Sequence, residues 1–184
     1  MAQVTLQPER DIDDPNQRVS GYYYTDMYNV LDPFVGTYLY TNGNTSFKII
    51  LQKKLHSSVG IYFEDMLIGG YRYVENGVEK VNVLNDLANN FARGTSHKIS
   101  GRVIMTGNKY GWTDCAPNEK WIYGSIEDPV SGSVDTLFIF KRIVGGQEAL
   151  KIFILHSIGF KPEGSPTPIP ISYPISQEII LIKQ

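Results

Sequence analysis

The chain of 184 residues is poor in the residues that build disulfides and metal sites. Its only cysteine is Cys115, so no internal disulfide can form. This fits a reducing compartment, although many exported bacterial proteins also lack disulfides. The histidines, His56, His97 and His156, lie far apart and match no metal-ligand spacing. We therefore predict no metal site, and we interpret Cys115 as a small packed residue in a loop rather than as a nucleophile.

The chain also lacks an excess of charge and a long apolar run. Its formal net charge is −2, which gives no basic surface of the kind that attracts nucleic acid. No run approaches the roughly 18 continuous apolar residues of a membrane span. We therefore expect neither a nucleic-acid partner nor a membrane-spanning segment.

Catalytic signatures are missing as well. There is no Gly-x-Ser-x-Gly elbow, phosphate loop or zinc motif. A glycosidase would need two carboxylates that converge across a cleft, whereas carboxylates in solvated turns are far commoner. The carboxylates nearest to the expected strand ends are Asp32, Glu64, Asp65, Asp114, Glu127 and Asp128. We predict that the protein is not an enzyme, with no catalytic residue and no cofactor.

Aromatic residues, by contrast, are plentiful, and the twelve tyrosines favour strands. Residues 31–51 predict two strands around Asn42-Gly43, the strongest short-range hairpin signal. A two-residue loop there pairs Tyr40 with Thr45, Tyr38 with Phe47, Gly36 with Ile49 and Phe34 with Leu51. One face of this hairpin then collects Phe34, Tyr38, Tyr40, Phe47, Ile49 and Leu51.

Two later hairpins follow the same pattern. Around Glu75-Asn76-Gly77 we prefer a three-residue loop that pairs Tyr71 with Val81, because one face then holds the apolar residues of both strands. Strands over 134–144 and 148–158 flank Gly145-Gly146. The predicted pairs of this hairpin are Ile139 with Ile152, Leu137 with Ile154, and Phe138 with Phe153. Apolar groups on both of its faces predict burial on both sides.

The remaining pattern completes an all-β chain. Further strands are expected over 60–68, 98–106, 119–126 and 175–183, with one short helical turn near 86–92 and with Gly69-Gly70 as a turn. Consecutive hairpins favour an antiparallel up-and-down meander of about eight to ten strands, because closing into a barrel removes exposed edges. The sequence therefore predicts a closed or nearly closed barrel.

The expected organisation is one domain with an N-terminal extension. Residues 1–30 are predicted to form an extended arm, whose tyrosines at 22–28 either pack across an open end of the domain or form a binding strip. Residues 31–184 form the β-barrel domain. Within it, five prolines forbid regular pairing over 159–175. We interpret that segment as a stiff strap, with a recognition segment as the alternative.

Two resemblances add to this interpretation. The run Leu31–Leu51, together with Ile68–Tyr73, resembles an uncharacterised family of small exported, flavobacterial-type proteins from Bacteroidota, a domain of unknown function. More distantly, Gly36-Thr37-Tyr38 is similar to the Gly-x-Trp entry of lipocalin-like barrels, with Tyr in the place of Trp. The first resemblance implies an exported protein and the second a lipocalin-like barrel. Ala2-Gln3 also matches a common signal-peptidase junction, so we expect export with the signal peptide removed.

Two classes of function stay open. In the first, the protein binds a small apolar or amphipathic ligand inside the barrel or at its mouth. The candidate ligand-binding residues, which fit a plain core equally well, are Tyr38, Tyr40, Phe47, Ile49, Tyr71 and Tyr73. In the second, an interaction or inhibitor protein contacts another protein through surface loops such as 107–118 and 159–175. A third interpretation uses Tyr110, Trp112 and Trp121 as an exposed platform for sugars.

Overall fold

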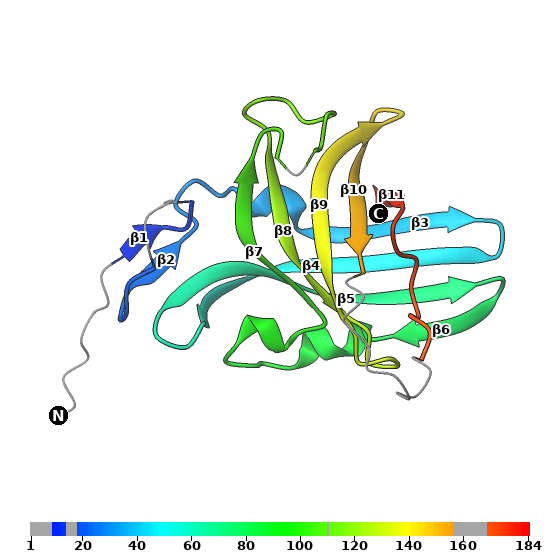
Figure 1. Ribbon diagram of the computed structural model, residues 1–184, viewed down its shortest axis with the longest axis horizontal. Helices are drawn as coiled ribbons and strands as arrows, with labels where there is room; N and C mark the ends of the chain where they lie inside the picture. The colour runs from blue at the N-terminus through cyan, green and yellow to red at the C-terminus, as the bar shows by residue number, and fades with distance from the viewer. Residues whose placement is uncertain (1–8, 14–17, 110, 157–168) are drawn as a thin grey trace, which may run out of the picture.

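The computed structural model describes residues 9–13, 18–109, 111–156 and 169–184 and shows a closed antiparallel β-barrel (Figure 1). Its eight strands are β3 (Gly36–Asn42), β4 (Thr45–Ser58), β5 (Phe63–Glu75), β7 (Ile99–Thr106), β8 (Lys120–Glu127), β9 (Val134–Val144), β10 (Gln147–Leu155) and β11 (Glu178–Lys183). Each strand pairs with the next around the barrel, and β11 returns to β3. The predicted all-β meander and its closure are confirmed.

Three short strands lie outside the barrel. The strand β6 (Val78–Asn82) forms a side hairpin with the distal half of β5. The strands β1 (Glu9–Asp11) and β2 (Tyr23–Thr25) are parallel, and β2 extends the sheet beside β5. Tyr24 is fully buried. In the part of residues 1–30 that the structure describes, the chain therefore joins the sheet rather than extending as a free arm.

The barrel interior is filled by its own side chains. Alternate residues of each strand point inward, as the pleat of a strand requires. The buried residues of β9 and β10 that belong to this core are Leu137, Ile139, Leu150, Ile152 and Ile154. They belong to the same core as Tyr38, Phe47, Ile49 and Tyr71 of β3, β4 and β5, all fully or almost fully buried.

The first hairpin has a different register from the predicted one. The observed pairs are Asn42 with Thr45, Tyr40 with Phe47 and Tyr38 with Ile49, so the turn residues are Gly43 and Asn44. Only Gly43 has a positive φ, +55°, which fits a type II′ turn with glycine at its first central position. Because the slip is two residues, the same side chains still point inward.

The second hairpin combines a shorter loop with a bulge. Asn76 and Gly77 both have positive φ and form a two-residue turn, so the predicted three-residue loop is wrong. The register shifts at Lys80, which places Val81 opposite Tyr73 instead of Tyr71. The bulge keeps Val81 buried. The three-residue loop was predicted for the same reason, since it placed the apolar residues of both strands on one face.

Gly69 and Gly70 do not form a turn, because β5 continues through both. A Cβ on Gly69 would lie 2.8 Å from the Ile50 carbonyl oxygen, and one on Gly70 would lie 2.8 Å from the Val83 carbonyl oxygen. These glycines allow neighbouring strands to approach closely where the barrel curves. The strand is therefore longer than the expected 60–68.

The third hairpin has the predicted register, with Ile139 opposite Ile152 and Phe138 opposite Phe153. Its outer face packs against residues 112–115, where Trp112 and Cys115 contact a cluster of phenylalanines. The sequence predicted burial on both faces of this hairpin, and the 107–118 loop covers its outer face. Residues 157–168 of the predicted strap lie outside the described residues.

Helical structure is limited to three isolated 3-10 turns, η1 (Asp32–Phe34), η2 (Leu84–Ala88) and η3 (Gly94–Ser96), within the described ranges. The turn expected near 86–92 corresponds to η2 and begins two residues earlier. None of the helices described is long and apolar enough to cross a membrane.

Candidate ligand site at the barrel mouth

One end of the barrel is closed by the segment 169–177, which connects to β11 (Figure 1). Its backbone is fixed at two points. The Ser172 amide donates to the Asp128 carboxylate at 2.7 Å, and the Ser176 amide donates to the Ile154 carbonyl at 2.8 Å. These hydrogen bonds connect the segment to the β8–β9 turn and to the end of β10.

Tyr173 is the side chain with which this segment enters the barrel. Its hydroxyl donates to Asp135 at 2.9 Å, and its ring meets the Tyr71 ring edge-on with centroids 5.5 Å apart. Burial, reinforced by the Asp135 carboxylate, raises the pKa of Tyr173 well above its ordinary value, so the hydroxyl stays protonated as a donor. His156 also contacts Asp135, at 2.7 Å from Nδ1.

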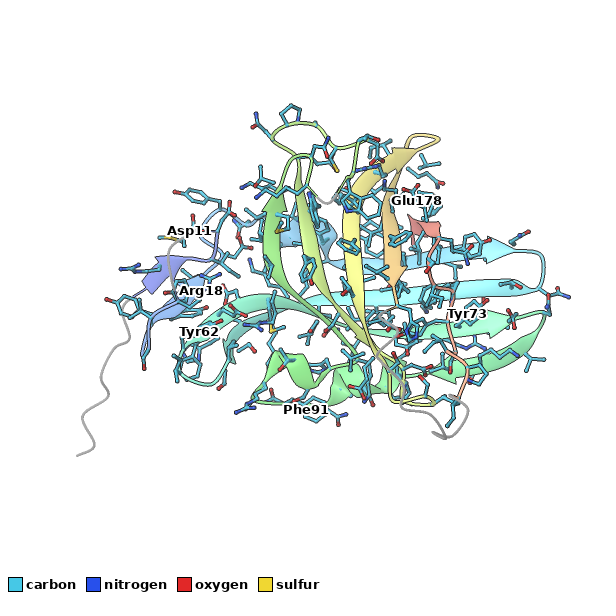
Figure 2. The ribbon with its side chains drawn as sticks, viewed as in Figure 1. Asp11, Arg18, Tyr62, Tyr73, Phe91 and Glu178 are labelled. Atoms are coloured by element: carbon cyan, nitrogen blue, oxygen red, sulfur yellow. The ribbon has the colours of Figure 1, made fainter. Side chains whose placement is uncertain are left out.

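Outside this closure lies a pocket of about 460 Å³ between the β5–β6 hairpin, the β8–β9 turn and residues 169–174. Tyr73, labelled in Figure 2, belongs to its β5 wall. The apolar part of the lining comprises Tyr73, Val130, Ile169, Pro170, Ile171, Tyr173 and Pro174. Val130 and Ile169 leave 50% and 57% of their surface exposed, so the pocket offers apolar surface that a ligand would cover.

The pocket also has a polar side. Glu75 and Lys80 line it and form an ion pair at 3.4 Å, with both side chains about half exposed. Burial, with a smaller contribution from the nearby Glu75 carboxylate, raises the pKa of Tyr73. The Tyr73 hydroxyl is therefore neutral at physiological pH. It lies 3.4 Å from Glu75 Oε1, so the pocket presents aromatic faces beside hydrogen-bonding and charged groups.

A smaller pocket of about 90 Å³ adjoins the first one. It shares Tyr73, Pro174 and Gln177 with the larger pocket and adds Tyr40 from β3. Tyr40 of β3 and Tyr73 of β5 thus lie at the same mouth of the barrel.

The six predicted ligand-binding residues divide into two groups. Tyr40 and Tyr73 line the mouth pockets, with Tyr40 half-buried. Tyr38, Phe47, Ile49 and Tyr71 are fully buried and fill the barrel. The rings of Phe47 and Tyr71 meet edge-on, 5.9 Å between centroids. The structure therefore places five of the six in the core, because Tyr73 is also buried, and Tyr40 packs against that core. Whether any of them binds a ligand stays a prediction.

Sequence reasoning missed the opposite wall of the pocket. This wall contains Tyr173, Ile169 and Ile171 of the Pro-rich segment, for which the prolines excluded regular strand pairing and so gave no reason to expect a buried face. The sequence 169–175 alternates Ile, Pro, Ile, Ser, Tyr, Pro and Ile. Such a period-2 pattern indicates one buried face, and Ile171, Tyr173 and Ile175 do pack against the core.

The carboxylates that the sequence analysis named near strand ends form hydrogen bonds and ion pairs within the fold. Asp65 accepts from the Tyr23 hydroxyl at 2.5 Å and from the Asp26 and His56 amides. Burial and this carboxylate raise the pKa of Tyr23 to about 12. The other polar contacts are Glu64 with Arg102, Asp32 with Lys53, Glu127 with Lys98, Asp114 with Lys151, and Asp128 with the Ser131 hydroxyl.

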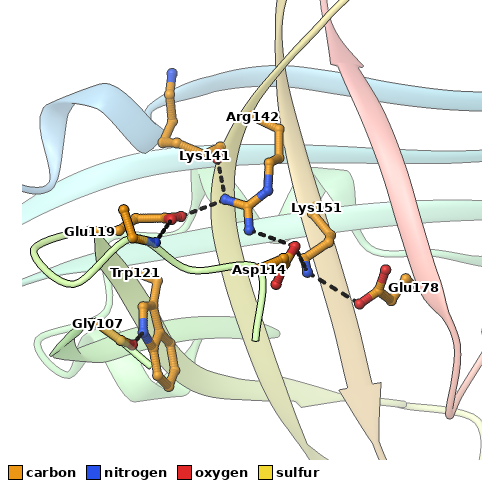
Figure 3. A network of polar contacts seen from close by, with 9 residues as sticks. Gly107, Asp114, Glu119, Trp121, Lys141, Arg142, Lys151 and Glu178 are labelled. Carbon is orange, nitrogen blue, oxygen red and sulfur yellow. Dashed lines mark hydrogen bonds and ion pairs between the residues drawn. The ribbon is translucent and has the colours of Figure 1, made fainter. Parts of the chain in front are cut away.

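The 107–118 loop is docked on the outer face of β9 and β10 (Figure 3). Asp114 accepts from Lys151 at 2.5 Å and from Arg142 at 3.0 Å, and Lys151 also reaches Glu178 at 3.1 Å. Trp121 is fully buried, so it offers no face to a sugar. Tyr110, which was also expected to belong to the platform for sugars, lies outside the described residues.

Cys115 is buried in the same contact, and burial raises the pKa of its thiol. This agrees with a packed residue. Over the described ranges, no group of three His, Cys, Asp or Glu side chains is arranged to hold a metal ion.

The closed meander, its filled interior and the pocket at one mouth define an all-β barrel protein. The chain matches a family of unknown function (DUF6705) over residues 2–184 and belongs to that family. Comparisons with curated proteins and with solved structures found no match.

Proposed function

We propose that the protein is a non-enzymatic binding protein that holds a small amphipathic ligand at the mouth of its barrel. The observation that carries this proposal is the pocket of about 460 Å³ between Tyr73 and the segment 169–174. Its volume falls within the roughly 300–1,000 Å³ of small-molecule sites. The barrel interior is occupied by side chains, so the ligand is assigned to the mouth rather than to the interior.

The lining supports an amphipathic rather than a purely apolar ligand. Aromatic and aliphatic side chains supply contact area, while Glu75, Lys80 and Gln177 offer polar groups that would orient the ligand. The exposed apolar surfaces of Val130 and Ile169 would be covered on binding. Removing that surface from water favours association by about 25 cal/mol per Å² before the entropic cost of binding.

The test uses a neutral aromatic fluorescent probe that carries a single N–H group, N-phenyl-1-naphthylamine, titrated with purified protein. Ile169→Asp and Val130→Asp place a carboxylate in the pocket on already exposed positions, so both variants should fold and both should weaken binding about tenfold or more. Matched controls are Ile143→Asp and Val144→Asp, which are exposed at 67% and 41% but do not line the pocket. Equal affinities for all five proteins would contradict the proposal.

Native mass spectrometry gives an independent measurement. A molecule that copurifies with the wild type and is lost in Ile169→Asp, but retained in Ile143→Asp, would support the mouth site and identify its ligand. A bound molecule retained equally in both variants would place the binding site elsewhere on the protein.

A further inference from the structure

A third pocket, of about 350 Å³, lies between the N-terminal segment and the strands β7 and β8. Ile12, Asp13 and Arg18 line it from one side, and Val103, Ile104 and Thr106 of β7 line it from the other. Figure 2 shows Arg18 beside β1 and β2, at the end of the molecule where the N-terminal segment packs. The pocket shares no lining residue with the mouth pocket.

The charges around this pocket are predominantly positive. Among the described residues that line it, Arg18, Lys109 and Lys120 are cationic and Asp13 is the one carboxylate. That carboxylate is already paired with Lys120. Lys109 has no ion-pair partner among the residues that the structure describes. A local excess of cations in a chain of net charge −2 favours an anionic ligand.

Arg18 is a lining cation whose side chain is held in place by two contacts. Its Nη2 donates to the Ile12 carbonyl at 2.9 Å, and its guanidinium carbon lies 4.1 Å from the centroid of the Tyr24 ring. Its Nη1 is buried and has no hydrogen-bond partner in the described chain. A buried charged donor without an acceptor is unfavourable, whereas a guanidinium that is held in place on a ring is preorganised to bind an oxyanion.

We propose that this pocket binds the carboxylate or phosphate group of a small organic molecule. Arg18 and Lys109 bind the oxyanion, with Lys120 contributing charge. Ile12, Val103 and Ile104 supply apolar wall, so the molecule carries a short aliphatic portion beside its acidic group. The site is independent of the one proposed at the barrel mouth.

Isothermal titration calorimetry at fixed ionic strength tests the proposal with three probes of one chain length, hexanoate, hexyl phosphate and hexanol. We expect at least one of the two anions to bind at least tenfold more tightly than the neutral alcohol, because only the anions oppose the positive charge of Arg18 and Lys109. The tighter anion then identifies the acidic group that the pocket selects. Equal binding of all three probes, or no anion binding at all, overturns the proposal.

Two variants locate the binding. Arg18→Gln and Lys109→Gln should each weaken binding of the tighter anion about tenfold. Lys48→Gln, which removes a lysine of β4 outside the pocket, and Ile169→Asp in the mouth pocket should leave it unchanged. If Arg18→Gln does not fold, Lys109→Gln alone decides, because its side chain has no ion pair to lose. Wild-type affinity in the folded variants overturns the proposal.

Discussion

At Lys151 a cationic side chain that is only 3% exposed lies on the outer face of the barrel. Its ammonium group contacts Asp114 and Glu178 and lies 4.9 Å from the centroid of the Phe140 ring. A buried cation is tolerated when it is paired and hydrogen-bonded. The 107–118 loop therefore contributes the carboxylate that makes this buried lysine acceptable.

Asp114 should make stability depend on pH. Hydrogen bonding from Lys151, with a smaller effect of Arg142, lowers the pKa of its carboxyl group below the ordinary 3.8. A lowered folded-state pKa stabilises the protein above the ordinary value, and the contribution disappears as the pH falls through the folded-state pKa. We expect D114N to lower the free energy of unfolding at pH 7 by about 1 kcal/mol, because Asp114 is half exposed.

Urea unfolding at several pH values measures this effect. Above about pH 4 the difference between wild type and D114N should stay constant, and below it the wild type should lose more stability than D114N, so that the two curves converge. Curves that run parallel over the whole range would show that the Asp114 contacts contribute nothing.

The paired glycines of β7 and β8 give a second prediction at the residue scale. A Cβ on Gly124 would lie 2.2 Å from the Ser100 carbonyl oxygen, whereas one on Gly101 would lie 2.6 Å from Cγ2 of Ile122. Backbone in a strand ladder cannot shift as a side chain can. We therefore expect G124A to cost about 3 kcal/mol or more and G101A about 1–2 kcal/mol, as measured by chemical denaturation. The reverse order would contradict the observed packing.

At the scale of elements, the segment 169–177 acts as a closure for one end of the barrel. Irregular backbone can serve there because its amides donate to Asp128 and to Ile154 instead of to a neighbouring strand. The segment thereby buries Tyr173 and forms one wall of the mouth pocket.

Removing the Tyr173 hydroxyl should weaken this closure. In Y173F the Asp135 carboxylate keeps the Ser133 and His156 contacts but loses one donor, so we expect a loss of about 1–2 kcal/mol. Y173A, which also leaves a cavity, should cost about 3–5 kcal/mol. Thermal unfolding checks both values, and Y28F, at an exposed tyrosine, is the control. No difference between Y173F and Y28F would mean that the hydroxyl does not hold the segment.

At the scale of the whole molecule, the barrel has two apolar layers that share strands. The inner layer fills the barrel, and the outer layer contains both tryptophans, Trp112 and Trp121. Because β8 to β10 contribute to both layers, neither should unfold alone.

Unfolding should therefore be a single transition. Tryptophan fluorescence reports on the outer layer, while far-ultraviolet circular dichroism reports on the barrel, and we expect their urea midpoints to coincide. A fluorescence change at lower urea would show that the 107–118 loop detaches before the barrel opens.

Export of the protein stays a prediction that fractionation of the native host would test.

Much of the fold could be predicted because strand periodicity and turn residues are local. The Ile139–Ile152 hairpin was predicted in its correct register, since Gly145-Gly146 permits one tight turn. The first hairpin slipped by two residues because Asn42-Gly43 and Gly43-Asn44 both support a turn and both keep the same side chains inward. Gly69-Gly70 was misinterpreted because the close approach of the Ile50 and Val83 carbonyls is not visible in sequence.

By itself, the sequence determined the alternation of inward and outward side chains and with it an all-β barrel, because each is encoded within a few neighbouring residues. Only the tertiary structure decided which side chains fill the barrel and which line a pocket. Tyr73, Val130 and Tyr173 are far apart along the chain and meet only when the barrel closes. The same holds for Arg18 and Lys109. Long-range juxtaposition of this kind depends on strand pairing and closure, and no local pattern contains it.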